Sequence, residues 1–301
     1  MFFLFKNDDG IIRSGWIIAF ALAMVLLGQL IFMMPGYTFI SLIETSKGNE
    51  EALMNILQTT PLYIVVTQGM GTIGGIAATL VVFRGINKKN PTKLGIHLPI
   101  KDFFTGLILG AAAITLIFFV LLITDNITLL NELTAPQLSM NLVLFLILYV
   151  LVGFFEEMFF RGYVIQTMLE HGNKKWVIYL VSAVVFGAVH FANPNPKLLG
   201  FVNIVLVGLL FAYMFDVTKS LLLPIGFHIT WNYFQGTVFG FPVSGTAPYG
   251  MYDIKVSKGM DVLTGGSFGL EGGLMATIVL GFCFAFTNIY AAHRGDRLID
   301  S

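Results

Sequence analysis

Charged residues are scarce in this chain of 301 residues. They make up only 11% of it, whereas 56% of its residues are hydrophobic and the mean hydropathy is +0.82. A soluble domain carries about 25% charged residues. Basic and acidic residues number 17 each, so the net charge is zero and no basic surface is available for nucleic acid. The composition indicates an integral membrane protein and excludes a nucleic-acid-binding protein.

Several other chemistries are excluded by what the sequence lacks. A single cysteine, Cys283, allows no disulfide framework and no thiolate metal cluster, and we expect it to pack as a small apolar residue. There is no H-E-x-x-H pattern and no pair of aspartates within the hydrophobic runs. Residues 265–269 match G-x-S-x-G, but a nucleophile elbow needs a strand before it and a helix after it, and this match lies in a glycine-rich stretch.

Long hydrophobic runs are abundant instead. Crossing the hydrocarbon core takes about 20 apolar residues. Eight runs predict an all-α fold, a polytopic transmembrane helical bundle of about eight spans, forming a single integral membrane domain over residues 1–301. The runs cover residues 14–34, 61–83, 103–123, 141–165, 176–192, 198–215, 220–236 and 272–291. The first run is too long for a signal peptide and lacks a cleavage site, so we expect it to be retained.

The loops between these runs predict the orientation. Basic residues gather in alternate loops: Arg84, Lys88, Lys89, Lys93, Lys101, Lys174, Lys175, Lys219, Arg294 and Arg297. The opposite loops are mostly acidic and carry Glu44, Glu50, Glu51, Asp125 and Glu132. By the positive-inside rule both termini are cytoplasmic. We therefore expect a multi-pass protein, which in a bacterial cell would lie in the cytoplasmic membrane.

Glycine marks two further features. Gly71-x-x-x-Gly75 and Gly106-x-x-x-Gly110 lie within predicted spans, where small residues let helices pack closely. Residues 237–271 form a long glycine-rich segment on the outer side, which we expect to be a loop with a functional or mobile character.

Three charges interrupt the fourth run. Glu157 and Arg161 are four residues apart, so they share a helix face and are expected to form an ion pair. Glu156 points elsewhere and has no counter-charge nearby in sequence, which suits it to accept a proton. Ionisable residues inside a membrane are expensive and mark functional sites by default. The alternative is a structural ion pair with one polar neighbour.

His190 is expected to meet Glu156. The turn between the fourth and fifth runs centres on Asn173, and both residues are seventeen positions from it. In an antiparallel helical hairpin, positions equidistant from the turn lie at the same depth. The alternative is a core histidine bonded to a backbone carbonyl.

His228 and Asn232 form a third element. Their spacing of four residues places both on one face of the seventh run. Two converging donors are what a developing oxyanion needs, although an interhelical hydrogen bond would use the same residues. A zinc site built from Glu156, His190 and His228 also stays open, because two histidines and a carboxylate can ligate zinc.

Taken together, the three patterns resemble a known family. Glu156-Glu157-x-x-x-Arg161, Phe186-x-x-x-His190 and His228-x-x-x-Asn232 are similar, in this order, to the motifs of the type II CAAX prenyl endopeptidases and their bacterial relatives, the CPBP family of intramembrane proteases. The resemblance covers roughly residues 140–240, which would be the catalytic core.

The resemblance implies an intramembrane glutamic endopeptidase, a hydrolase that needs no cofactor and no metal. Glu156 and His190 would activate water, His228 and Asn232 would form the oxyanion hole, and Glu157 and Arg161 would support them. The partners would be the bilayer and a membrane-associated or CAAX-like protein or peptide, lipidated or not. The alternative function is a non-enzymatic immunity or interaction protein, or a proton-coupled transporter that uses Glu156 and His190 as a relay.

Overall fold

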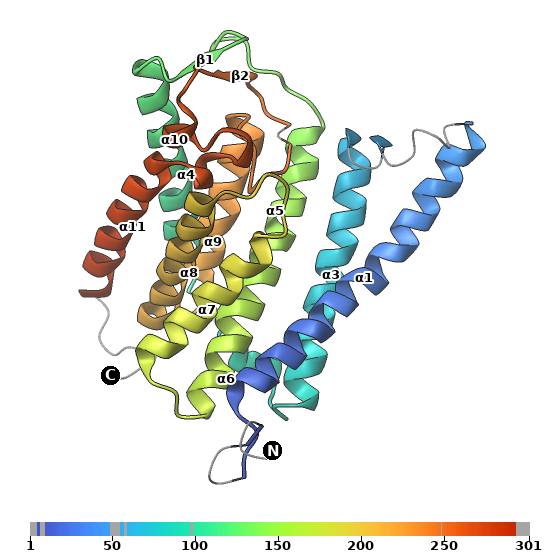
Figure 1. Ribbon diagram of the computed structural model, residues 1–301, viewed down its shortest axis with the longest axis vertical. Helices are drawn as coiled ribbons and strands as arrows, with labels where there is room; N and C mark the ends of the chain where they lie inside the picture. Colours follow the sequence, from blue (N-terminus) through green and yellow to red (C-terminus); the bar gives the residue numbers. More distant parts are fainter. Residues whose placement is uncertain are drawn as a thin grey trace.

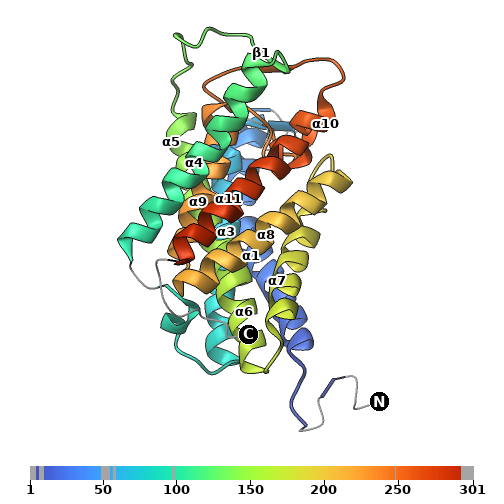
Figure 2. The same ribbon diagram turned by 90° about the vertical axis from the view of Figure 1, so that its left-hand side faces the viewer.

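The protein is a bundle of long helices, seen in a computed structural model that describes residues 5–6, 10–48, 55–56, 59–96, 99–247 and 249–292 (Figures 1 and 2). The principal helices are α1 (Ser14–Ser46), α3 (Pro61–Gly85), α4 (Ile100–Ile123), α5 (Asn141–Glu157), α6 (Ile165–Glu170), α7 (Lys175–His190), α8 (Leu198–Thr218), α9 (Leu222–Asn232) and α11 (Leu274–Ala292). Two π-helical segments, η3 (Met158–Val164) and η4 (Tyr233–Val238), prolong α5 and α9. The predicted helical membrane bundle is confirmed.

Six of the described helices are long and apolar enough to cross a membrane. All eight predicted runs are helical, but α7 has only 16 residues and the continuous stretch α9–η4 covers residues 222–238. Both fall short of the length of about 20 residues that a straight span requires. The protein is therefore a multi-pass integral membrane protein, whereas the count of eight spans stays a prediction.

Glycine sets the closest helix contacts. A side chain at Gly106 of α4 would collide with the backbone carbonyl of Leu223 in α9, and one at Gly110 with that of Phe227. On the other side of the bundle, Gly71 of α3 faces Met33 of α1, with a contact of 2.7 Å to any added Cβ. Both predicted glycine pairs thus serve helix packing.

The helices α1 and α3 form a pair at one side of the bundle (Figure 1), and α3 is the member that packs against α5. The helix α1 is longer than the predicted run of residues 14–34, because it continues through Pro35 to Ser46. A proline removes one backbone hydrogen bond from a helix, and the remaining turns of this long helix hold it together.

The glycine-rich segment after η4 is not a plain loop, contrary to expectation. Its strand β2 (Ile254–Val256) pairs antiparallel with β1 (Ile127–Leu129), with Ile127 opposite Val256. It also contains α10 (Asp261–Thr264) and the short 3₁₀ helices η5 (Gly266–Phe268) and η6 (Leu270–Gly272). The pairing with β1 could not be read from either segment alone, since each strand has three residues.

The first residues of α1 and the last residues of α11 lie towards the same end of the bundle (Figure 1). Two of the basic segments meet at this end. Lys89 of one segment forms an ion pair with Glu170, which lies shortly before Lys174 and Lys175 of the other. The side of the membrane that this end faces stays a prediction. Four residues used to predict it lie outside the described residues: Glu50, Glu51, Arg294 and Arg297.

Candidate active site

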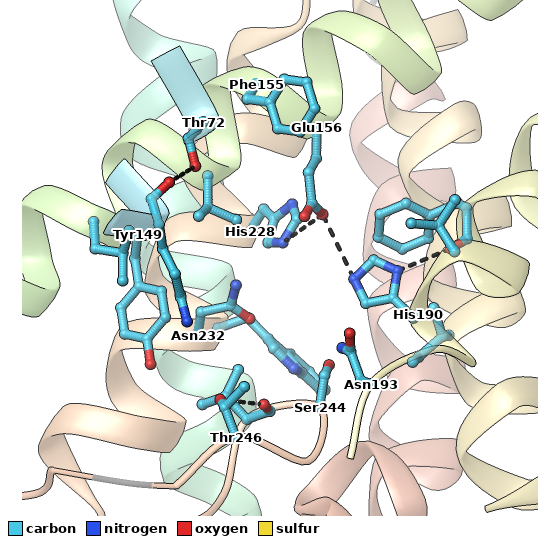
Figure 3. Close-up of a pocket in the computed structure, with 18 of the residues that line it drawn as sticks. Thr72, Tyr149, Phe155, Glu156, His190, Asn193, His228, Asn232, Ser244 and Thr246 are labelled. Carbon is cyan, nitrogen blue, oxygen red and sulfur yellow. Dashed lines mark hydrogen bonds and ion pairs between the residues drawn. The ribbon is translucent and has the colours of Figure 1, made fainter. Parts of the chain in front are cut away.

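A cavity of about 340 Å³ lies among α1, α3, α5, α7, α8 and α9. Four of the predicted site residues line it, namely Glu156, His190, His228 and Asn232. In Figure 3 the Glu156 side chain reaches between the two imidazole rings. Pockets of ~300–1,000 Å³ are typical for ligand binding in proteins, so this cavity can admit part of a peptide.

Glu156 lies at the centre of this group. Its Oε2 atom is 3.7 Å from Nε2 of His190 and 3.7 Å from Nε2 of His228. These separations exceed a direct hydrogen bond and match groups that share a water molecule. Oε2 is buried and accepts no hydrogen bond from the described part of the protein. The predicted meeting of Glu156 and His190 across the α5–α7 hairpin is therefore present.

His190 ends α7 and is held by its own helix. Its Nδ1 lies 2.8 Å from the backbone carbonyl oxygen of Phe186. A carbonyl oxygen only accepts, so Nδ1 carries the proton in this contact. In the neutral ring Nε2 is then an acceptor that faces Glu156. The carbonyl bond considered as the alternative role of His190 thus coexists with its position in the cavity.

Glu157 and Arg161 lie behind the cavity wall, and both side chains are 0% exposed. Nη1 of Arg161 is 3.0 Å from Oε1 of Glu157, so the predicted ion pair is present. Arg161 also donates through Nη2 to the backbone oxygen of Gly208 at 3.3 Å. Its guanidinium carbon lies 4.3 Å from the ring centroid of Phe186 and 5.0 Å from that of Phe211. Such stacking favours arginine over lysine at a buried position.

His228 makes a hydrogen bond to Glu157 that the sequence did not predict. Its Nδ1 lies 3.0 Å from Oε1 of Glu157, the same oxygen that Arg161 contacts. A carboxylate only accepts, so Nδ1 of His228 carries a proton and its Nε2 is directed to the cavity. Glu157 therefore orients His228 as well as balancing Arg161.

Asn232, one turn beyond His228, is 8% exposed and lines the cavity. Its side-chain amide has no hydrogen-bond partner among the described residues, unlike a residue that ties two helices together. Both α5 and α9 change to π-helical geometry within or just after their motifs, because η3 follows Glu157 and contains Arg161, and η4 follows Asn232. Segments of π-helix are frequent at functional sites.

Several polar cavity residues escaped the sequence analysis. They are Gln29, Gln68, Thr72, Tyr149, Asn193, Ser244, Thr246 and Glu271. The sequence could have singled out Gln29 and Gln68, since each is a polar amide within an apolar helix. Nothing in the sequence singled out Ser244 and Glu271, because they come from the glycine-rich segment and only its folding brings them to the cavity (Ser244 is labelled in Figure 3).

Glu271 is 4% exposed and lies where the glycine-rich segment meets the cavity. Burial raises the pKa of this carboxyl, while hydrogen bonds from Gln235 and Ser244 and the nearby His190 oppose the rise. The amide nitrogen of Gln235 lies 2.5 Å from Oε2 of Glu271. Ser244, which has a positive φ of 45°, contacts Oε1 through its hydroxyl at 3.4 Å.

Cys283 and the G-x-S-x-G match at residues 265–269 lie as expected. Cys283 is buried in α11. Ser267 lies in the short 3₁₀ helix η5, which is not the strand-turn-helix context of a nucleophile elbow. Within the described ranges, no group of three or more His, Cys, Asp and Glu side chains is arranged to hold a metal ion.

Comparison with known proteins places this geometry in context. No curated protein and no solved structure matches the chain. A family model does match, over residues 138–234, which include all six predicted site residues. It describes the type II CAAX prenyl endopeptidase Rce1-like family, so the resemblance predicted from the three motifs is confirmed over this part of the chain.

Proposed function

We propose that the protein is an intramembrane endopeptidase that cleaves a peptide bond with water activated between Glu156 and His190. The observation that carries the proposal is the position of Oε2 of Glu156, 3.7 Å from Nε2 of both His190 and His228 inside the cavity. Because no described protein group donates a hydrogen bond to Oε2 of Glu156, this oxygen is free to bind a water molecule.

The hydrogen-bond acceptors of His190 and Glu156 determine the orientation of this water molecule. Neutral His190 offers a lone pair at Nε2, and Glu156 offers a carboxylate oxygen. A water between them donates both hydrogens, so the lone pairs of its oxygen face the cavity. When this oxygen attacks the carbonyl carbon of the peptide bond, its proton passes to the pair, which then returns it to the leaving amine. General acid–base assistance of this kind is worth ~10²–10⁴ in rate.

His228 and Asn232 are proposed to stabilise the oxyanion that forms on the carbonyl oxygen. Asn232 donates through its unpaired amide. His228 already donates Nδ1–H to Glu157, so Nε2 donates to the oxyanion when the ring is protonated on both nitrogens. Removing one such donor typically lowers kcat by ~10²–10³.

The substrate class follows from the surroundings of the cavity. Its walls are membrane helices with many apolar residues, which supports a membrane-associated protein or peptide as the substrate. The family model supports a substrate of CAAX-like type. Lipidation would add affinity for the bilayer, since each buried methylene contributes ~0.8 kcal/mol. The proposal does not require a lipid on the substrate.

Cleavage of a membrane proteome tests this function. New peptide termini are identified by mass spectrometry after incubation with purified wild type, with Glu156→Gln, and with Glu132→Gln as a control in the exposed outer loop. We expect wild type and Glu132→Gln to produce the same new termini and Glu156→Gln to produce none. Wild-type turnover by Glu156→Gln would end the general-base assignment. Absence of cleavage by wild type would favour a non-enzymatic role or a proton relay between Glu156 and His190.

A further inference from the structure

Glu271 is a second carboxylate of the cavity, and the proposed mechanism does not use it. It lines the cavity together with Glu156, but it comes from η6, beyond the segment that matches the family model. Neutral groups hold its side chain: Gln235 donates its amide to Oε2, and Ser244 contacts both carboxylate oxygens. Glu271 forms no ion pair with a lysine, arginine or histidine of the described residues. Glutamate is almost never buried to this extent unless it is paired.

The other buried carboxylates of the described chain behave differently. Four of them each contact a cation or a tyrosine hydroxyl within 3.0 Å. These contacts are Glu44 with Lys47, Asp102 with Tyr290, Glu157 with Arg161 and Asp216 with Lys175. Glu271 has neither kind of partner, although it is 4% exposed, as is Glu44. A carboxylate buried without a counter-charge is costly, so the contrast points to a ligand that supplies the charge.

The amide beside Glu271 points to a ligand of the same kind. The side-chain nitrogen of Gln235 lies 2.6 Å from the backbone oxygen of Pro242 and 2.5 Å from Oε2 of Glu271, which uses both of its hydrogens. Oε1 of Gln235 is buried and accepts no hydrogen bond from any described residue. The surroundings of Glu271 are therefore rich in acceptors and short of donors. Ammonium and guanidinium groups have only donors and carry a positive charge.

The backbone holds Glu271 in place. Asn203 of α8 donates to the backbone oxygen of Glu271 at 2.7 Å and to that of Gly273 at 2.9 Å. Gly269 has a φ of 98°, and a Cβ atom there would be 1.9 Å from the backbone oxygen of Pro242. The carboxylate is thus positioned before a ligand arrives, which lowers the entropy cost of binding.

This carboxylate lies in a different part of the cavity from Glu156. In Figure 3 Ser244, whose hydroxyl contacts Oε1 of Glu271, lies well apart from Glu156. A group bound at Glu271 is therefore beside the water between Glu156 and His190 and does not replace it.

We propose that Glu271 binds a positively charged group of the substrate, an ammonium or a guanidinium, and so selects peptides that carry such a group near the bond that is cut. The inference rests on the proposed function and deepens it. The charged group is either a basic side chain or the free N-terminus of the peptide, and the experiment separates these two sources.

Binding is measured on detergent-solubilised Glu156→Gln protein, in which Glu271 is the remaining carboxylate among the described residues that line the cavity. Three pools of apolar decapeptides are titrated. The first has one lysine and an acetylated N-terminus, the second has acetyl-lysine and an acetylated N-terminus, and the third has acetyl-lysine and a free N-terminus. We expect the first or the third pool to bind ~10- to 100-fold more tightly than the neutral second pool, the effect of a hydrogen bond between charged groups. The pool that does so identifies the source of the charge.

The substitution Glu271→Gln, added to Glu156→Gln, should remove this difference and leave binding of the neutral pool unchanged. Glutamine keeps the size of the side chain and can still accept from Gln235, but it has no charge. Glu44→Gln is the matched control, because it removes an equally buried carboxylate that does not line the cavity, and it should keep the difference. A preference for the charged pool that survives Glu271→Gln would overturn the inference. Equal weakening for all three pools would also overturn it and assign Glu271 a neutral hydrogen-bonding role.

A second measurement needs no substitution at Glu271, so it is independent of whether that variant folds. An apolar carbodiimide joins a carboxylate to an adjacent amine as an amide and takes up the water that is lost, becoming a urea. After treatment of the Glu156→Gln protein with the charged pool and this reagent, mass spectrometry should find the peptide attached to Glu271. Attachment only at other carboxylates would contradict the inference.

Cleavage is read separately from binding. Among the new termini that wild type releases from the membrane proteome, a lysine, an arginine or a free N-terminus should recur at one distance from the cut, and Glu271→Gln should lose this pattern. Cleavage without the pattern, together with equal binding of the three pools, would overturn the inference and leave the protease assignment intact. Binding that depends on Glu271, by a protein whose wild type cleaves nothing, would support the inference and contradict the proposed protease function.

Discussion

Nδ1 of His228 and Oε1 of Glu157 are 3.0 Å apart, and this contact links the cavity to the buried ion pair behind it. The same oxygen lies 3.0 Å from Nη1 of Arg161. A change at Arg161 should therefore reach His228 through one shared carboxylate, although Arg161 does not line the cavity.

The first prediction concerns this ion pair. Arg161→Ala should lower the free energy of unfolding by ~3–5 kcal/mol, because it leaves a fully buried carboxylate without its cation. It should also lower activity, since Glu157 then loses its fixed position beside His228. Thermal melting in detergent and the cleavage assay measure the two effects. Glu156→Gln is the control, with lost activity and a retained melting temperature. An unchanged melting temperature for Arg161→Ala would show that the pair contributes nothing to stability.

The second prediction concerns Asn232. Asn232→Ala should lower kcat by ~10²–10³ with little change in KM, as removal of an oxyanion donor does. The motivation is that its amide is directed to the cavity and has no partner among the described residues. Steady-state kinetics on a substrate identified by the proteome experiment give both constants. A rise in KM at constant kcat would instead assign Asn232 to substrate binding.

The third prediction concerns Glu271 and pH. Its pKa is raised in the folded protein, chiefly by burial. Above the ordinary pKa the unfolded chain loses this proton while the folded protein retains it, so the stability of wild type falls as pH rises towards the raised value. Glu271→Gln has no proton to lose. We expect the melting temperature of wild type, relative to that of the variant, to decrease as the pH rises above the ordinary pKa of a glutamate side chain. A difference that does not change with pH would contradict this.

The fourth prediction concerns metal. Activity should survive exhaustive chelation, because a carboxylate beside an imidazole can activate water without a metal ion. The measurement matters because each histidine has Nδ1 held and Nε2 free, an arrangement that also orients zinc ligands. Elemental analysis with about one zinc per chain, together with loss of activity on chelation and recovery with zinc, would reassign Glu156, His190 and His228 as metal ligands.

Much of this architecture was determined by the sequence alone. The hydrophobic runs predicted the helical membrane bundle, because spanning segments must satisfy their backbone within themselves. The spacing of Glu157 and Arg161 predicted their ion pair, and the distances of Glu156 and His190 from one turn predicted that they would meet. These relationships are local or cross a single hairpin, so helix periodicity suffices to derive them.

Other features were decided only by the tertiary structure. The contact between His228 in α9 and Glu157 in α5 joins residues that are 71 positions apart in the sequence, and no local periodicity relates them. The folding of residues 239–273 brings Ser244 and Glu271 to the cavity, and the packing of α1 and α3 turns Gln29 and Gln68 towards it. The physical reason is that a helix pattern shows which residues share a face, whereas the neighbour of that face depends on how all the helices pack together.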